Sequence, residues 1–132
     1  MISIVFVVVV LIASVASQCS FCGPYDVNAY NLPNYIGPKP FPFNSSSGYI
    51  EVDTTNQRYL YYWLIESQSG HPDTDPLVFW YQGGPGCSGL AGLFAEHGPF
   101  RVNENGQVVL AQFSWNSFAN IVYLEQPCGV GF

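Results

Sequence analysis

A cluster of three glycines and one proline is the first place where this sequence could do chemistry. The string Gln82-Gly83-Gly84-Pro85-Gly86 follows five apolar or aromatic residues, Leu77–Tyr81. Glycine adopts backbone angles closed to other residues and carries no side chain that would keep a ligand away, while proline stiffens the loop. If a helix follows, the backbone N–H groups at its start attract negative charge. The string therefore predicts an anion-binding loop or simply a tight turn, and it lacks the spacing of phosphate-binding and dinucleotide-binding loops.

Few side chains near the glycines could take part in nucleophilic or acid–base catalysis. The chain has no Gly-x-Ser-x-Gly string, the elbow that presents a nucleophilic serine between a strand and a helix. Gly86-Cys87-Ser88-Gly89 has the wrong spacing, so Ser88 is expected to be structural. Taken alone, Glu96 is typical of a solvated helix residue, and nothing about His97 indicates a catalytic histidine.

The four cysteines are disulfide candidates, because chains that enter an oxidising compartment usually pair their thiols. They are Cys19, Cys22, Cys87 and Cys128, and the sequence leaves their pairing open. The Cys19-x-x-Cys22 spacing could also indicate redox or zinc chemistry. Neither a second cysteine pair nor a histidine pair completes a zinc set, so we expect no metal and no other cofactor.

The pattern of apolar residues predicts the elements that must position these groups. Tyr49, Ile50 and Val52 indicate a strand, followed by a polar turn and a return strand over residues 58–66, which together form a hairpin. Leu77–Tyr81 lacks alternation, which is typical of a strand covered on both faces in an α/β sheet. Further elements are expected at residues 67–76 (loop), 90–96 (one or two helical turns, ended by Gly98-Pro99), 108–110 (short edge strand) and 121–124 (buried strand).

The amino-terminal part predicts a secreted chain. Residues 2–12 are almost entirely apolar and are followed by small residues, which favours a signal peptide over residues 1–17 rather than a core helix or a membrane anchor. Residues 18–46 contain five prolines and are interpreted as an irregular arm. Asn44-Ser45-Ser46 fits the N-glycosylation acceptor pattern.

Charge excludes two classes of partner. Nine acidic residues against three basic ones, with a net charge of -6, leave no cationic cluster for nucleic acid or for anionic membranes. We therefore expect neither nucleic-acid binding nor stable membrane insertion once the signal peptide is removed.

Residues 47–132 contain a series of motifs that keep the order and spacing of one known family. They include Ser47-Gly48-Tyr49, Tyr61-Tyr62-Trp63, residues 79–90, Gly92-Leu93-Phe94, Glu96-His97-Gly98-Pro99-Phe100, Ser114-Trp115-Asn116, Tyr123-Leu124-Glu125, Pro127 and residues 129–132. A match of this length makes chance very improbable. On these motifs the sequence resembles the serine carboxypeptidase family, with protective protein/cathepsin A and carboxypeptidase Y among the similar members.

The resemblance implies the amino-terminal part of an α/β-hydrolase fold, namely the first strands of its central sheet and its oxyanion loop. It also implies release of carboxyl-terminal residues from peptides at acidic pH, in an extracellular or lysosomal setting. For the full-length enzyme it allows a homodimer. The N–H of Gly84 would be one oxyanion donor, worth about 3–4 kcal/mol of transition-state stabilisation. Gln82 and the N–H of Gly83 would hold the substrate carboxylate, with Trp80 bordering them. Glu96 would share a proton with a second glutamate and donate a hydrogen bond to that carboxylate.

Some residues depart from the family pattern. Gln82 stands where asparagine is usual, Tyr81 and Gly89 replace leucine and serine, and Cys128 replaces alanine. In the family Cys87 pairs with a cysteine far downstream, and the triad Ser, Asp and His also lie downstream of the matched residues. We therefore expect an amino-terminal fragment, inactive alone, of a serine carboxypeptidase. The alternatives are a non-catalytic secreted product and an acyltransferase on the same fold.

Overall fold

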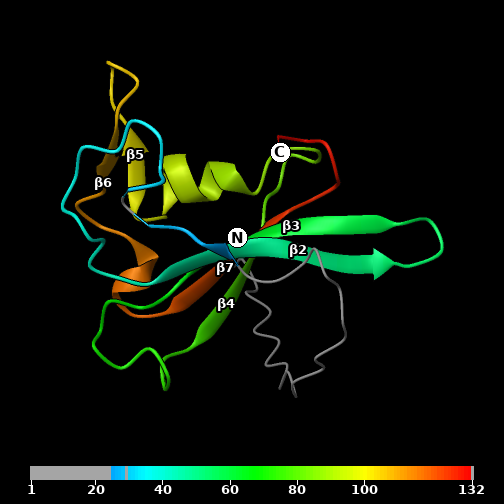
Figure 1. Cartoon of the computed structure of the whole chain (residues 1–132), viewed down its shortest axis with the longest axis horizontal. Coiled ribbons are helices and arrows are strands. Elements are labelled where there is room, and N and C mark those ends of the chain that lie inside the picture. Colours follow the sequence, from blue (N-terminus) through cyan, green and yellow to red (C-terminus); the bar gives the residue numbers. More distant parts are fainter. Residues whose placement is uncertain (1–24, 29, 132) are drawn as a thin grey trace, which may run out of the picture.

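A five-stranded mixed sheet is the framework of the chain in the computed structural model, which describes residues 25–28 and 30–131. The strands lie in the order β1-β2-β3-β7-β4, and only the β4–β7 pair is parallel (Figure 1). Their bounds are β1 Tyr25–Asp26, β2 Ser45–Asp53, β3 Arg58–Ile65, β4 Leu77–Tyr81 and β7 Asn120–Glu125. The signal peptide predicted over residues 1–17 and the candidates Cys19 and Cys22 lie outside the described residues.

The β2–β3 hairpin confirms the two strands predicted on either side of residues 53–56. Asp53 closes the turn, since its carboxylate accepts hydrogen bonds from the backbone N–H and the side chain of Asn56 at 3.0 and 2.6 Å. β2 begins earlier than expected, at Ser45, because Ser45 and Ser47 both face inward and Trp63 Nε1 donates to Ser45 Oγ at 2.7 Å. A serine-rich strand start carries no apolar alternation, so the sequence pattern does not reveal it.

β7 lies between β3 and β4 and confirms the buried strand predicted at residues 121–124. Every residue from 121 to 125 is buried. The expectation that β4 is covered on both faces was wrong for the described part of the chain. Its Val78 and Trp80 pack toward the core, whereas Leu77 is 41% exposed and Tyr81 is 56% exposed. The reason is that no layer of the described residues covers the face of β4 on which Leu77 and Tyr81 lie, so an unbroken apolar run does not by itself mean two covered faces.

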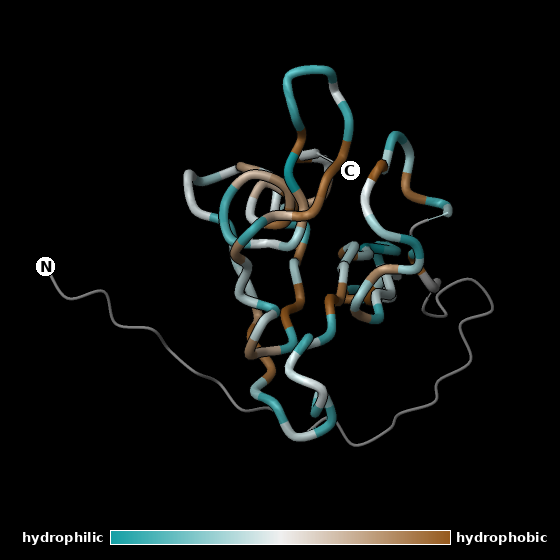
Figure 2. The backbone as a smooth tube through the Cα atoms, turned by 90° about the vertical axis from the view of Figure 1, so that its left-hand side faces the viewer, coloured by the Kyte–Doolittle hydropathy of each residue, from teal (hydrophilic) through white to brown (hydrophobic). Residues whose placement is uncertain are grey.

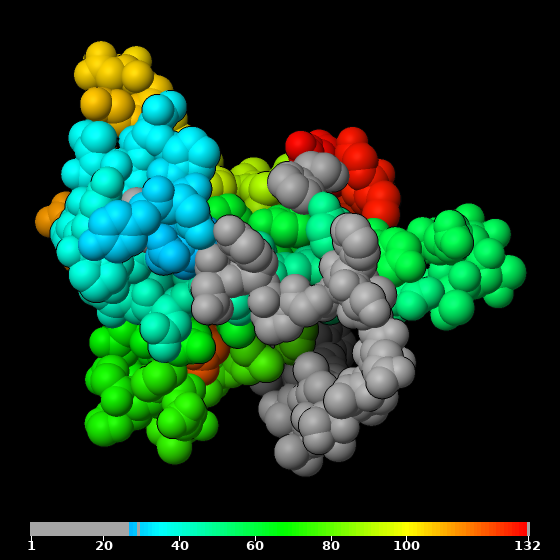
Figure 3. Space-filling view, viewed as in Figure 1, coloured from blue at the N-terminus to red at the C-terminus, as the bar shows by residue number. Residues whose placement is uncertain are grey.

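A second layer covers one face of the sheet and provides the core. It consists of the helical turn η1 (Gly92–Glu96), the hairpin of β5 (Phe100–Val102) and β6 (Val108–Leu110), and the short turn η2 (Trp115–Ser117). η1 confirms the predicted helical turns, and β6 confirms the predicted short strand. The β5–β6 turn is hydrophilic and projects from the body (Figure 2), as does the end of the β2–β3 hairpin (Figure 3).

The segment interpreted as an irregular arm supplies core residues as well as loops. Tyr35, Phe41 and Phe43 are buried and surround Phe100 of β5, with ring centroids 5.3–6.2 Å from it. Residue 35 also bridges Val108 of β6. Aromatic rings spaced among prolines therefore pack the arm onto the second layer.

Candidate functional site

The glycine turn leaves the carboxyl end of β4 and enters η1. Gly84 has φ 121° and Gly86 has φ 83°, both values that other residues rarely adopt. Gly83 and Gly84 are exposed, and within the described residues neither backbone N–H has a hydrogen-bond acceptor in the chain. The turn thus presents two adjacent amide donors to solvent.

Gln82 links the start of this turn to the end of η1. Its Nε2 donates to Glu96 Oε1 at 2.7 Å, and its Oε1 accepts from Trp80 Nε1 at 2.8 Å. Gly92 makes room for this arrangement, since a Cβ there would lie 2.6 Å from Trp80 Nε1. The sequence-predicted residues Trp80, Gln82 and Glu96 therefore form one hydrogen-bonded chain beside Gly83 and Gly84.

The end of η1 is capped by Arg101, which sequence reasoning did not single out. Its guanidinium donates to the carbonyl oxygens of Gly98 at 3.0 Å and Phe100 at 2.5 Å, and also to that of Glu96. Cations stabilise the carbonyl end of a helix. Arg101 thus fixes the backbone from which the Glu96 side chain reaches Gln82.

His97 lies in an aromatic cage next to Glu96. Its ring stacks on Trp115 with centroids 4.3 Å apart and meets the edge of Trp80 at 4.1 Å. Its Nδ1 is 3.2 Å from Tyr123 Oη, and its Nε2 is buried without a partner in the described residues. Burial lowers the pKa of His97, while the neighbouring Glu96 acts against that shift. The ring contacts place His97 in the packing beside Glu96, and its lack of a catalytic role stays a prediction.

Ser88 and Glu125 hold the far end of the turn. Glu125 is 1% exposed, and its Oε2 accepts hydrogen bonds from Ser88 Oγ at 2.7 Å and from the Leu90 N–H at 3.3 Å. Sequence reasoning treated Ser88 as structural and gave Glu125 no separate role. A carboxylate at the end of an otherwise apolar strand was the available signal, because charged residues are almost never fully buried without partners.

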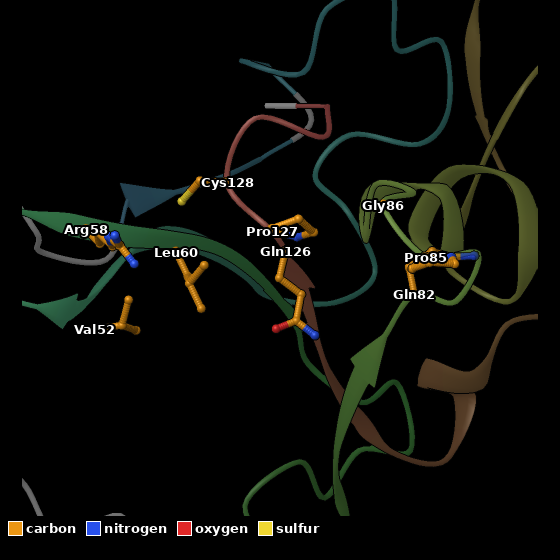
Figure 4. Close-up of a pocket in the computed structure, with 9 residues that line it drawn as sticks. All are labelled: Val52, Arg58, Leu60, Gln82, Pro85, Gly86, Gln126, Pro127 and Cys128. Carbon is orange, nitrogen blue, oxygen red and sulfur yellow. The ribbon is translucent and has the colours of Figure 1, made fainter.

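A groove of about 700 Å³ runs past the turn. Figure 4 shows that residues from the turn, from the β2–β3 hairpin and from the segment after β7 line it. The lining is mainly apolar, with two amide side chains and one cation: Val52, Arg58, Leu60, Gln82, Pro85, Gly86, Gln126, Pro127 and Cys128.

Three further sequence candidates are placed by the structure. Cys87 and Cys128 are exposed free thiols, so they do not form a disulfide with each other, and Cys128 Sγ donates to the Tyr59 carbonyl oxygen at 2.7 Å. Asn44 is exposed, and its Nδ2 donates to Glu66 Oε2 at 2.9 Å.

The described residues, 25–28 and 30–131, contain no group of three or more His, Cys, Asp or Glu side chains placed to hold a metal ion. None of the helices in this part of the chain has the length and hydrophobicity of a membrane span.

Comparisons with known proteins point to one family. The family model described as serine carboxypeptidase matches residues 33–132. Serine carboxypeptidase ctsa-3.1 of Caenorhabditis elegans is 48% identical over 103 residues, which are 77% of this chain and 17% of that relative. Carboxypeptidase Y homolog A of Aspergillus oryzae is 48% identical over 112 residues, which are 80% of this chain and 20% of that relative.

A solved structure gives the same result for the fold. Kex1(delta)p, a prohormone-processing carboxypeptidase from Saccharomyces cerevisiae, matches with a TM-score of 0.65 and 32% identity, over 80% of this chain and 24% of that one. The sheet and its covering layer are thus part of an α/β-hydrolase fold. The chain spans about a fifth of the length of the curated relatives it matches.

Proposed function

Because this chain belongs to the serine carboxypeptidase family, we propose that its glycine turn and Gln82 form the oxyanion and carboxylate-binding part of a serine-type carboxypeptidase site. The substrate is a peptide with a free carboxyl terminus. The enzyme releases the last residue of that peptide, and acid favours the reaction. It acts in the secretory pathway, in the lysosome or outside the cell. The observation that carries the proposal is the pair of unpaired, exposed amide donors at Gly83 and Gly84 beside the Gln82–Glu96 hydrogen bond.

The Gly84 amide suits a negative oxygen that develops during the reaction. Its N–H has no acceptor to give up within the described residues, and positive φ values hold the turn in a shape that other residues resist. An amide aimed in advance costs no reorganisation when charge appears on the scissile carbonyl. Gly84 therefore supplies one donor, and the second comes from outside the residues described.

Gln82 suits the terminal carboxylate of the substrate. A side-chain amide carries two N–H donors, of which one is bonded to Glu96 Oε1. Gln82 also lines the groove, and the exposed Gly83 follows it directly in the chain. In this proposal the second donor of Gln82 and the Gly83 N–H hold the substrate carboxylate together. In this proposal Glu96 shares a proton with a second glutamate from outside the described residues, and the shared proton, which acid supplies, adds a third donor to the substrate carboxylate.

The chain by itself is proposed to be inactive as a peptidase, because it contains no Gly-x-Ser-x-Gly elbow. Its binding half can be tested without catalysis. Amide and side-chain NMR shifts of Gly83, Gly84 and Gln82 are followed while N-acetyl-leucine or N-acetyl-leucinamide is added at pH 4.5. N-acetyl-leucine, which has a free carboxylate, is expected to shift these signals. N-acetyl-leucinamide, which has none, is expected to leave them unchanged. Equal responses to both ligands contradict the carboxylate site.

Two glutamine variants sharpen the test. Gln82→Leu is expected to weaken binding of N-acetyl-leucine by about tenfold or more, the usual loss when a charged group forfeits a hydrogen bond. Gln107→Leu is the matched control, since Gln107 Oε1 also accepts a hydrogen bond, from Asn103 Nδ2 at 3.0 Å, but in the distant β5–β6 turn. Grafting residues 33–132 into the matching segment of the C. elegans relative then tests catalysis. Gln82→Leu in that chimera should lower kcat/KM for free peptides and not for their terminal amides.

A further inference from the structure

Glu125 is a buried carboxylate at the point where three segments meet. It ends β7, and Ser88 and Leu90 of the turn donate to its Oε2 at 2.7 and 3.3 Å. The Leu90 N–H also lies 3.1 Å from Ser88 Oγ. Burial of a carboxylate is unfavourable unless donors surround it. The donors from the turn are therefore required wherever Glu125 is ionised and buried.

Two glycines bring the backbone close to this carboxylate. A Cβ at Gly89 would lie 2.0 Å from the Leu124 carbonyl oxygen, and one at Gly131 would lie 2.6 Å from Glu125 Oε1. Contacts this short leave no room for a side chain at either position. The end of the glycine turn and the segment after β7 thus both lie against the end of β7.

We propose that Glu125 is a positioning residue for the glycine turn. Its carboxylate holds Ser88 and the Leu90 N–H, and thereby fixes where the turn enters η1. This rests on the proposed function, because the groups it positions are the Gly83 and Gly84 amides and, through η1, the carboxylate of Glu96. Glu125 does not line the groove and acts only through its neighbours.

The two ends of the turn explain why such an anchor is needed. At the β4 end, Gln82 is held by Trp80 and Glu96. The middle of the turn has unpaired amides and positive φ angles, so it cannot keep its shape through its own hydrogen bonds. The Ser88–Glu125 contact provides the second fixed end, and it is made by an element, β7, that is buried from Ile121 to Glu125.

Hydrogen exchange on the full chain tests the anchoring. Glu125→Gln keeps the shape of the side chain and removes its charge, and Ser88→Ala removes one donor. Each is expected to raise the exchange rates of the Leu90, Ala91 and Gly92 amides by about tenfold or more, while amides of the β2–β3 hairpin keep their rates. Glu66→Gln is the matched control, because Glu66 also accepts a side-chain hydrogen bond, from Asn44, but far from the turn.

A second readout separates positioning from general stability. In Ser88→Ala and Glu125→Gln, affinity for N-acetyl-leucine should fall about tenfold at a temperature where each variant is still fully folded, whereas Glu66→Gln should keep its affinity at the same temperature. If Glu125→Gln unfolds the chain, Ser88→Ala decides the question.

The proposal is overturned if turn amides exchange as in the unmodified chain, or if Ser88→Ala accelerates turn and hairpin amides equally. It is also overturned if Ser88→Ala leaves an existing affinity for N-acetyl-leucine intact. If the unmodified chain binds no N-acetyl-leucine but the exchange pattern appears, the anchoring role stands, and the failure falls on the carboxylate site instead.

Discussion

Replacing Gly84 by alanine tests whether the turn depends on a backbone shape that only glycine supplies. At φ 121° a non-glycine residue is strained by about 1–3 kcal/mol. A Cβ there would also lie 2.5 Å from Cys87 Sγ, so Cys87 must leave its rotamer at a cost of about 0.5–1.5 kcal/mol. Gly84→Ala should therefore lower the free energy of unfolding by about 2–4 kcal/mol.

Gly106→Ala is the matched control for backbone strain alone. Gly106 has φ 71°, and a Cβ there would have no atom within 4 Å. It should lower the free energy of unfolding by only about 1–2 kcal/mol. Urea unfolding of the reduced chain, monitored by tryptophan fluorescence, measures both variants under the same conditions.

The collision with Cys87 can be isolated by a double-mutant cycle. In a Cys87→Ala background, the cost of Gly84→Ala should shrink by about 0.5–1.5 kcal/mol, because the Sγ that blocks the new Cβ is absent. The reasoning fails if Gly84→Ala costs no more than Gly106→Ala, or if the cycle shows no coupling. Either result would mean that the turn moves freely and does not hold its amides in place.

Two further predictions concern the aromatic cage and the glycosylation acceptor. Burial lowers the pKa of His97, so the unfolded chain binds a proton more readily than the folded one; stability is full above about pH 6.5 and falls as the pH drops below it. In His97→Phe the urea unfolding midpoint should change less between pH 6.5 and about pH 5 than in the unmodified chain. In the control His71→Gln, at an exposed position, the midpoint should fall with pH as it does in the unmodified chain. In a secretory host, Asn44→Gln and Ser46→Ala should each remove one N-linked glycan, seen as a mass loss, and Ser45→Ala should retain it. Ser45→Ala should instead destabilise the fold by about 1–3 kcal/mol, because buried Trp63 Nε1 loses its acceptor.

The sequence pattern predicted those strands that consist mainly of branched and aromatic residues. The return strand of the hairpin, the strand before the glycines and the strand around Ile121 all contain runs of branched and aromatic residues. Ser45 and Ser47 point inward without being apolar, so the start of β2 was hidden. The exposure of Leu77 and Tyr81 could not be predicted from the sequence either. An apolar composition shows that a strand is suited to burial, but it does not show whether another layer of the protein covers each face of that strand.

The site divides in a similar way. Gln82, Gly84 and Glu96 were reached through the family resemblance, since each alone is typical of a turn or a solvated helix. The anchors of the turn at Glu125 and the cage around His97 depend on contacts between residues 17–37 positions apart. Such contacts are set by the sheet order, in which β7 lies between β3 and β4, and no local spacing in the sequence encodes that order.

Gln82 in place of the usual asparagine follows from its two partners. The amide must reach Glu96 Oε1 at 2.7 Å and Trp80 Nε1 at 2.8 Å at the same time. An asparagine is shorter by one carbon–carbon bond, about 1.5 Å, which exceeds the tolerance of a hydrogen bond. From the same backbone position it would lose at least one partner. Gly92 contributes to the match, because it lets the Trp80 indole approach η1 closely enough to meet the longer side chain. Trp80, Gln82 and Gly92 therefore act as a set, and the amide of Gln82 is held in place before any carboxylate arrives.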